Sequence, residues 1–429
     1  MIKLKKLLIF ILTSILFISA CSNEVIIRSD DIKLSEFKNR ELKSPKNIVS
    51  SIDDLSYLMD YMTFYKLEEP ITIKIDDEFK NSIYNIKLIL NEAKEKSLIS
   101  DVFHIDYDIN KYKSLSIITL RLYKTEVATI KSEGNSEIKL IPSFNKEIKE
   151  EKNNTYYLEN NNKGYLSVVD SEQLYYAIIN GYMPICKVGS AAEDIYLQMI
   201  DILNRIYSDD EFNMLKNIYD FLTHEVKYDN VAQGSSDFNL ERNQAYFLEG
   251  VFLNRLAVCD GLSKAYSMMC NYVGIENVRI RASNDNLALH SYNYVNLFDT
   301  WYLSCPTSGS HRVRINDVIY QIPSYNMMLT TLKTPYKDDW SYKSLMHKDI
   351  EECISKEEYP YYLNNNLYLN SYDEILKLIK DGMSVEFKTS LDDSSMLLIK
   401  DELEKVIGKE VIVLKQRSTL DNIYTIFLL

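Results

Sequence analysis

Apolar residues along the chain recur at two spacings, and these spacings predict alternating helices and strands. Ser51 is of a residue type that commonly caps helix N-termini, and the apolar residues that follow it stand three and four positions apart. A strand, a helix and two further strands are predicted next, at residues 71–75, 79–96, 102–109 and 115–123. The pattern therefore predicts a small α+β module near the N-terminus.

The same order of elements returns near the C-terminus. A helix is predicted from Ser371, and it is followed by a strand, a helix and two strands at residues 385–389, 393–407, 411–414 and 423–428. A third, partial copy begins at Ser171, with a strand at residues 183–188 and a helix at residues 191–206. We therefore predict related modules on both sides of a central domain.

The central part of the chain is predicted to place a cysteine at the start of a helix. One helix is predicted from Asp209 to residues 224–228, and a second begins at Ala257 with apolar residues three and four positions apart. Cys259 falls at or just before the first turn of this second helix. Free backbone N–H groups and the helix dipole favour a thiolate at that position.

Three strands, at residues 278–282, 290–297 and 301–305, follow this helix. Phe298 and Asp299 fit a two-residue hairpin turn, which would make His290 and Cys305 diagonal neighbours about 7–8 Å apart at the backbone. A cysteine thiol and a histidine are the minimum equipment for thiol catalysis. A chain with six cysteines and five histidines offers many such pairs, so these two residue types alone leave a purely structural role open.

The composition narrows the classes of protein. The chain has 429 residues, of which 46% are hydrophobic and 26% charged, as expected for two or three folded domains rather than a disordered or fibrous chain. A net charge of −13 argues against a nucleic-acid partner. The cysteines and histidines lack the spacing of a disulfide framework or a metal site, and no glycine-rich phosphate loop occurs, so we expect neither metal nor cofactor.

The first twenty residues have the pattern of an export signal. Lys3, Lys5 and Lys6 precede an apolar run over residues 7–18, which is too short to span a bilayer. The run ends in Ile18-Ser19-Ala20-Cys21, which resembles the lipobox of bacterial lipoproteins. Diacylglycerol on Cys21 would anchor the mature protein in the membrane, facing outside the cytoplasm. The alternative is an ordinary cleaved signal with a chance cysteine.

Three motifs in the central region resemble the bacterial transglutaminase-like superfamily. The chain reads Ala-Val-Cys259-Asp-Gly261, His290-Ser-Tyr292-Asn293 and Trp301-Tyr302-Leu-Ser-Cys305-Pro306-Thr307. The family reads roughly Val-Cys-Glu-Gly-Tyr, His-Ala-Trp-Asn and Trp-Tyr-x-x-Asp-Pro-Thr, in the same order and at similar spacing. The segment from Tyr219 to Tyr228 and the triplet Gln244-Ala-Tyr246 also look like the family's lead-in, so that the resemblance covers about residues 190–310.

This resemblance implies a papain-like fold with a Cys-His-Asp triad that carries out transglutamination, peptide hydrolysis or related acyl transfer. By position, Cys259 is the implied nucleophile and His290 the implied general base and acid. The lead-in places Gln244 or Tyr246 near the oxyanion hole. Cys305 stands where the family has its aspartate.

The cysteine at the third triad position departs from the family pattern. The aspartate of such a triad orients the imidazole and stabilises the imidazolium, whereas a thiol is only a weak hydrogen-bond acceptor. Cys305 could itself ionise beside His290, or Thr307 or Asp285 could supply the acceptor, since Asp299 is expected to belong to the turn. The departure makes a catalytically inactive scaffold or binding protein a serious alternative.

The sequence therefore predicts an α+β protein whose central papain-like, transglutaminase-like domain is flanked by small α+β modules. Its expected partners are the membrane, through Cys21, and a peptide or protein substrate or ligand at the cell envelope. The predicted division is a signal peptide, a tether, a module, a linker, the transglutaminase-like domain with its helical lead-in, a second linker and a second module, at residues 1–20, 21–45, 46–125, 126–169, 170–340, 341–368 and 369–429.

Overall fold

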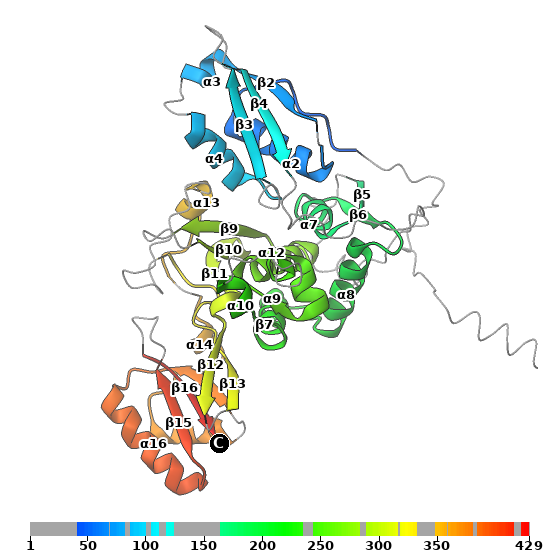
Figure 1. Cartoon of the computed structure of the whole chain (residues 1–429). Helices are drawn as coiled ribbons and strands as arrows, with labels where there is room; N and C mark the ends of the chain where they lie inside the picture. The colour runs from blue at the N-terminus through cyan, green and yellow to red at the C-terminus, as the bar shows by residue number, and fades with distance from the viewer. Residues whose placement is uncertain are drawn as a thin grey trace, which may run out of the picture.

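The computed structural model describes most of the chain from residue 41 onward. The described residues are 41–67, 69–81, 86–99, 104–110, 117–123, 164–234, 243–283, 289–315, 318–332, 348–357, 359–380, 384–415 and 422–428. The predicted signal peptide, Cys21 and Asp285 lie outside these ranges. Helices and small sheets are mixed throughout, which confirms the predicted α+β class (Figure 1).

The N-terminal unit is a four-stranded sheet with its own hydrophobic core. Its elements are β1 (Ile48–Val49), α2 (Ile52–Phe64), β2 (Ile71–Ile75), α3 (Asp77–Asn81), α4 (Ile86–Lys96), β3 (His104–Asn110) and β4 (Ile117–Tyr123). The strand order is β1-β2-β4-β3, and apolar residues of α2, β2 and α4 form the core. The single helix predicted at residues 79–96 is therefore described as two helices, α3 and α4.

The C-terminal unit is a three-stranded sheet with a second, separate core. Its elements are α15 (Tyr372–Lys380), β14 (Ser384–Lys388), α16 (Asp393–Ile407), β15 (Val411–Lys415) and β16 (Ile423–Leu428). The strand order β14-β16-β15, antiparallel throughout, is equivalent to the antiparallel order β2-β4-β3 of the N-terminal unit. The two units thus share the order of elements α-β-α-β-β and the equivalent strand order.

Three helices in equivalent positions begin with the same reciprocal cap. In α2, the Ser51 hydroxyl accepts from the Asp54 N–H at 3.0 Å, and the Asp54 carboxylate accepts from the Ser50 N–H at 2.9 Å. The same exchange opens α15 and α7 (Ser171–Ile179), where the residue pairs are Ser371 with Glu374 and Asp170 with Gln173. Because the cap satisfies orphan N–H groups locally, each start is specified by a few residues of sequence.

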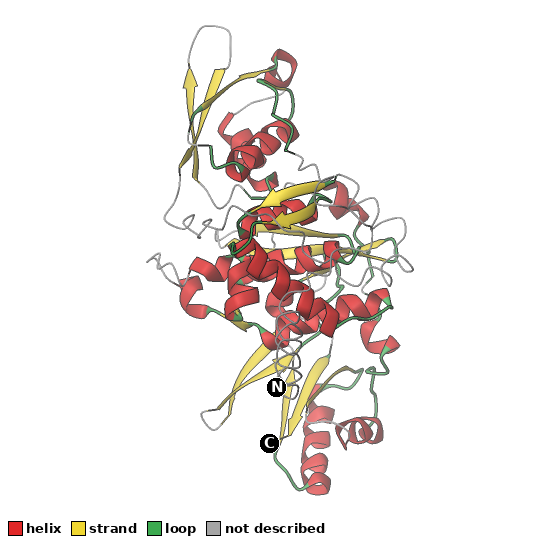
Figure 2. Cartoon of the chain, turned by 90° about the vertical axis from the view of Figure 1, so that its right-hand side faces the viewer, coloured by secondary structure: helices red, strands yellow, loops and turns green. Residues whose placement is uncertain are grey.

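The central region contains the remaining elements, and most of its helices lie between the N-terminal and the C-terminal sheets (Figure 2). It begins with β5 (Tyr165–Val168), α7, β6 (Met183–Cys186), α8 (Ala191–Arg205) and α9 (Glu211–Asp220). The elements of its middle part are η4 (Phe221–Glu225), β7 (Lys227–Tyr228), α10 (Asn230–Gly234), η5 (Gln244–Tyr246), η6 (Gly250–Asn254), β8 (Leu256–Ala257) and α12 (Cys259–Tyr272). It ends with β9 (Asn277–Ser283), β10 (Leu289–Leu297), β11 (Thr300–Ser304), η7 (Pro306–Ser308), β12 (Ser310–Ile315), β13 (Val318–Pro323), α13 (Lys348–Cys353) and α14 (Tyr361–Asn364).

The central sheet has the antiparallel order β11-β10-β9, and α12 packs against β9 and β10. Phe298 and Asp299 form the turn between β10 and β11, with φ values of 52° and 60°. Both residues are thus in the left-handed conformation that a tight hairpin turn of this kind requires. The pairing of Asn293 with Ser304 and of Leu297 with Thr300 confirms the register predicted from the sequence.

A cluster of aromatic side chains joins the C-terminal unit to α9. Tyr361 stacks on Tyr325 with ring centroids 4.6 Å apart, and the Tyr325 hydroxyl donates to Asp220 at 2.8 Å. The Glu386 carboxylate of β14 accepts from the Tyr362 hydroxyl at 2.7 Å. Tyr361 and Tyr362 are buried, so both belong to the core rather than to an exposed ligand surface.

A buried carboxylate holds the end of α4 against α2. Asp60 is 4% exposed, and its Oδ1 accepts from the Ser97 hydroxyl at 2.6 Å and from the N–H groups of Leu98 and Ile99 at 3.0 Å. Burial raises the pKa of Asp60 to about 6, although these hydrogen bonds and the nearby Arg281 favour the charged form. The turn after α4 is therefore tied to a group that titrates in the mildly acidic range.

We expect Asp60→Asn to flatten the pH dependence of stability between about pH 4 and about pH 6. The folded-state pKa lies above the ordinary value of 3.8, so the stabilising contribution is complete at low pH and is lost as the pH rises through about 6. Asparagine keeps an oxygen acceptor but does not titrate. Urea unfolding across this pH range measures the free energy of unfolding of the wild type and of Asp60→Asn. The control is Lys400→Ala, which removes a half-exposed ion pair on α16. Identical slopes for wild type and Asp60→Asn would contradict the expectation.

Candidate functional site

Cys259 is the first residue of α12, and two short strands deliver it there. β7 and β8 pair in parallel, with Tyr228 beside Ala257, and β8 leads through Val258 into the helix. The helix thus begins two residues later than the predicted start at Ala257, because Ala257 belongs to β8. Cys259 is a half-buried free thiol. Its position at the N-terminus of a 14-residue helix favours a negative charge on sulfur.

A glycine lets another segment approach the first turn of α12. A Cβ atom at Gly261 would lie 2.5 Å from the Ala245 carbonyl oxygen and 3.1 Å from that of Phe247. The Ala245 carbonyl also accepts from the Val258 N–H at 2.9 Å. Only glycine fits this contact, so η5 is fixed directly against the beginning of the Cys259 helix.

His290 and Cys305 are in direct contact. The Nε2 atom of His290 lies 3.3 Å from the Cys305 sulfur, which in turn donates to the Ser308 hydroxyl at 3.7 Å. The backbone of Cys305 is held on both sides, because its N–H donates to Met327 at 2.9 Å and its carbonyl accepts from Tyr219 at 3.2 Å. The buried sulfur therefore has a fixed position, and His290 can direct an N–H at it.

Two tyrosines interact electrostatically with the Cys259 thiol. Burial, followed by the charge of the Cys259 sulfur, raises the pKa of Tyr228, whereas the Cys259 backbone N–H acts to lower it. The charge of Cys305 also raises the pKa of Tyr228. Burial, Cys259 and Asp260 likewise raise the pKa of Tyr246.

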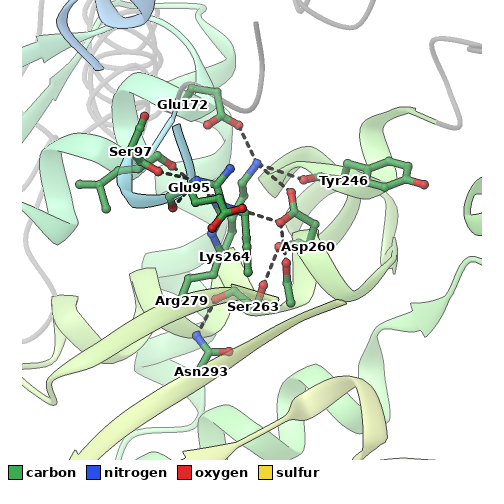
Figure 3. A network of polar contacts seen from close by, with 12 residues as sticks. Glu95, Ser97, Glu172, Tyr246, Asp260, Ser263, Lys264, Arg279 and Asn293 are labelled. Carbon is green, nitrogen blue, oxygen red and sulfur yellow. Dashed lines mark hydrogen bonds and ion pairs between the residues drawn. The ribbon is translucent and has the colours of Figure 1, made fainter. Parts of the chain in front are cut away.

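The residue after Cys259 is the centre of a charged network (Figure 3). The Asp260 carboxylate accepts from Arg279 at 2.6 Å and from the Ser291 hydroxyl at 3.0 Å, and it forms an ion pair with Lys264 at 3.1 Å. Lys264 also contacts Glu172 at 3.3 Å. The side chains of Lys264 and Arg279 are only 1% and 4% exposed, so the two cations offset the cost of burying the carboxylates.

This network extends to the N-terminal unit. Arg279 also donates to the Leu98 carbonyl at 3.3 Å, and Arg281 lies 2.7 to 2.8 Å from the carbonyl oxygens of Lys94, Glu95 and Ser97. These carbonyls are at the C-terminal end of α4 and just beyond it, where a helix has unpaired acceptors and a partial negative charge. Two arginines of β9 therefore cap α4 across the boundary between the units.

The structure locates most of the residues that the sequence singled out. The Gln244 side chain accepts from Asn254 at 2.7 Å, and the Tyr246 hydroxyl donates to the Ala232 carbonyl at 3.2 Å. The Thr307 hydroxyl has no hydrogen-bond partner among the described residues, so it does not supply the acceptor for His290. The sulfur of Cys305 itself occupies that place.

Tyr228, Arg279 and Ser308 were not identified as site residues from the sequence. Tyr228 ends the lead-in segment that resembles the transglutaminase-like family, and this was a signal that could have been used. Arg279 and Ser308 have no such signal, because their partners are distant in sequence or depend on the local path of the chain.

The remaining cysteines lie in ordinary surroundings. Cys186 and Cys270 are buried and Cys353 is exposed, and burial raises the pKa of Cys270 well above its usual range. Within the described ranges, no three His, Cys, Asp or Glu side chains are grouped so that they could hold a metal ion. Nor does any helix there combine the length and apolar character needed to cross a membrane.

Comparisons with known proteins give little guidance. No protein family and no curated protein matches the sequence. A solved structure described as "Crystal structure of a TGase" matches with a TM-score of 0.24 and 14% identity over 61% of this chain. The match covers 59% of that protein, so this chain spans about three fifths of its length. At so low a TM-score the likeness carries no argument, and function must be inferred from the residues themselves.

Proposed function

We propose that this chain is a lipid-anchored, transglutaminase-like protein that carries out thiol-dependent acyl transfer on peptide or protein amides outside the cytoplasm. The observation that carries the proposal is the 3.3 Å contact between His290 Nε2 and Cys305. A proton on Nε2 directed at the sulfur leaves Nδ1 of the neutral ring as the base. Cys259 is the nucleophile.

The reaction follows from these roles. Nδ1 of His290 removes the thiol proton of Cys259, and the thiolate adds to the amide carbonyl carbon. The carbon–nitrogen bond then breaks, and the leaving amine takes the proton from His290. Water or a second amine attacks the resulting thioester, gives a proton to His290 and releases the Cys259 thiolate with the new acid or amide as product. No cofactor is required for this sequence.

The alternative is a protein that keeps the fold and binds a cell-envelope ligand without catalysis. The observation in its favour is the neutral thiol at the third position of the triad, since Cys305 is buried and a weak acceptor. The two functions differ in one measurable property, the reactivity of Cys259. A binding protein has no need of an ionised thiol.

We expect Cys259 to react with iodoacetamide at pH 7 about 10–30-fold faster than an ordinary exposed thiol, because an ordinary thiol is only a few per cent ionised at this pH. Cys353 is exposed and serves as the reference within the same chain. Mass spectrometry of each cysteine-containing peptide gives the rates. His290→Ala is expected to slow Cys259 and leave Cys353 unchanged, and His224→Ala, on η4, is the matched control. Equal, slow rates for Cys259 and Cys353 would favour the binding protein.

Cys305→Asp is expected to increase the rate at which Cys259 is acylated by p-nitrophenyl acetate. An aspartate there would accept a charge-assisted hydrogen bond from His290 and stabilise the imidazolium. In serine proteases, exchanging that aspartate for a neutral amide lowers turnover by about 10⁴, which sets an upper limit on the gain expected here. Cys305→Ala should lower the rate, and Cys353→Ala should leave it unchanged. No gain with aspartate and no loss with alanine would mean that another group orients His290.

The lipid anchor predicts a covalent modification at Cys21. When the full chain is produced in bacteria with a labelled fatty acid, the protein should incorporate the label and partition into the detergent phase of a phase-separating detergent. Cys21→Ser should abolish both properties, whereas Cys353→Ala should affect neither. A mature protein that begins elsewhere and remains in the aqueous phase would contradict the anchor.

A further inference from the structure

We propose that Ser291 is a positioning residue, which holds the strand of His290 against the start of the Cys259 helix by donating a hydrogen bond to Asp260. The inference rests on the proposed function, in which Cys259 is the nucleophile and His290 the base. It adds to the site a residue for which the sequence predicted no role.

The hydrogen bond joins the chain neighbours of the two residues that react. Ser291 directly follows His290, and Asp260 directly follows Cys259. The Ser291 hydroxyl donates to Asp260 Oδ1 at 3.0 Å, and Ser291 is only 5% exposed. A hydrogen bond to an ionised carboxylate is stronger than one between neutral groups. This bond therefore ties β10 to the first turn of α12 directly beside the histidine and the cysteine.

Asp260 is a fixed anchor for this bond. Its Oδ1 also accepts from Arg279 at 2.6 Å, and its Oδ2 lies 3.1 Å from the ammonium of Lys264. Arg279 comes from β9, and Lys264 comes from the next turn of α12. Because two cations also hold this carboxylate, a displacement of β10 would break the bond from Ser291 rather than carry Asp260 with it.

A second contact fixes the register between β10 and α12. The Asn293 side-chain amide donates to the Ser263 carbonyl at 3.0 Å (Figure 3). Residues two apart on a strand point to the same face, and residues three apart on a helix lie on one face. Ser291 and Asn293 therefore meet Asp260 and Ser263 in matching order. The contact nearer to His290 is the one that Ser291 makes.

The position of the imidazole matters because it moves a proton twice. It takes the proton of the Cys259 thiol and later gives it to the leaving amine, and each transfer needs a hydrogen-bond distance of about 2.6–3.2 Å. A misplacement of about 1 Å can lower a rate about 10²-fold. The ring of His290 is held by the 3.3 Å contact of Nε2 with Cys305. The bond from Ser291 fixes the backbone that carries this ring relative to the nucleophile.

Acylation of Cys259 by p-nitrophenyl acetate in the full chain tests this role. Ser291→Ala is expected to slow acylation about 10–10²-fold, because His290 is no longer held at the distance that proton transfer needs. Ser267→Ala is the matched control, since it removes another buried serine hydroxyl between α12 and the sheet, which donates to the Asn277 carbonyl at 2.8 Å. The control should react at the wild-type rate, and thermal unfolding confirms that each variant is folded.

Two comparisons separate positioning from an effect on folding. Threonine and valine have the same shape, but only threonine has a hydroxyl. Ser291→Thr should therefore keep most of the wild-type rate, and Ser291→Val should lose it as alanine does. In a His290→Ala background, Ser291→Ala should cause no further loss, because a residue that acts through the imidazole then has nothing left to position.

Each other outcome overturns a specific statement. Wild-type acylation of Ser291→Ala, or equal rates for the threonine and valine variants, overturns the positioning role alone. A loss that persists in the His290→Ala background means that Ser291 acts on the Cys259 helix or on folding, which also overturns it. If Ser291→Ala does not fold, the threonine and valine variants make the same comparison. A wild-type Cys259 that is not acylated, and that iodoacetamide alkylates no faster than Cys353, overturns the proposed function and the positioning role with it.

Discussion

The half-buried carboxylate of Asp260 is the constraint on which the arrangement of the site depends. Asp260 directly follows Cys259, and Ser291, which bonds to it at 3.0 Å, directly follows His290. The separation between the helix that carries the cysteine and the strand that carries the histidine is therefore fixed by a hydrogen bond between their chain neighbours. Burying such a carboxylate is costly unless cations accompany it. Lys264 and Arg279 meet this requirement, one from the next turn of α12 and one from β9.

The same requirement links the N-terminal unit to the site. Arg279 divides its hydrogen bonds between Asp260 and the Leu98 carbonyl, so the charge that holds the Cys259 helix also holds the segment after α4. From the other side, Asp60 binds the N–H group of Leu98. An arginine has five donors in a rigid plane, which lets one side chain satisfy a carboxylate and a carbonyl in different units. The geometry near Cys259 is consequently coupled to the docking of the N-terminal unit.

The sequence was sufficient wherever the structure is specified locally. The Ser51 and Ser371 caps, the periodic helices and the Phe298–Asp299 turn all depend on residues a few positions apart, and the register of that turn places His290 beside Cys305. It was insufficient for β7 and β8, because strands of two residues have no period to detect. The partners of Tyr228 and Arg279 could not be found from the sequence either, because they depend on how distant segments pack. Thr307 shows the converse, because its hydroxyl is a plausible acceptor in the sequence but has no hydrogen-bond partner among the residues that the structure describes.

A thiol in place of an aspartate changes the energetics of the triad in two opposing ways. Cys305 is fully buried, and an unpaired carboxylate there would carry a large desolvation cost that a neutral thiol avoids. The thiol in return gives His290 orientation without a negative charge, since it accepts from Nε2 on one side and donates to Ser308 on the other. Orientation is the part of the aspartate's role that a neutral residue can preserve, whereas stabilisation of the imidazolium is the part it loses. The loss matters less if the proton moves to His290 before substrate binds, because the Cys259 thiolate at the start of α12 then pairs with the imidazolium directly. The proposed chemistry therefore depends on the N-terminus of α12 for the electrostatic stabilisation that an aspartate would otherwise share.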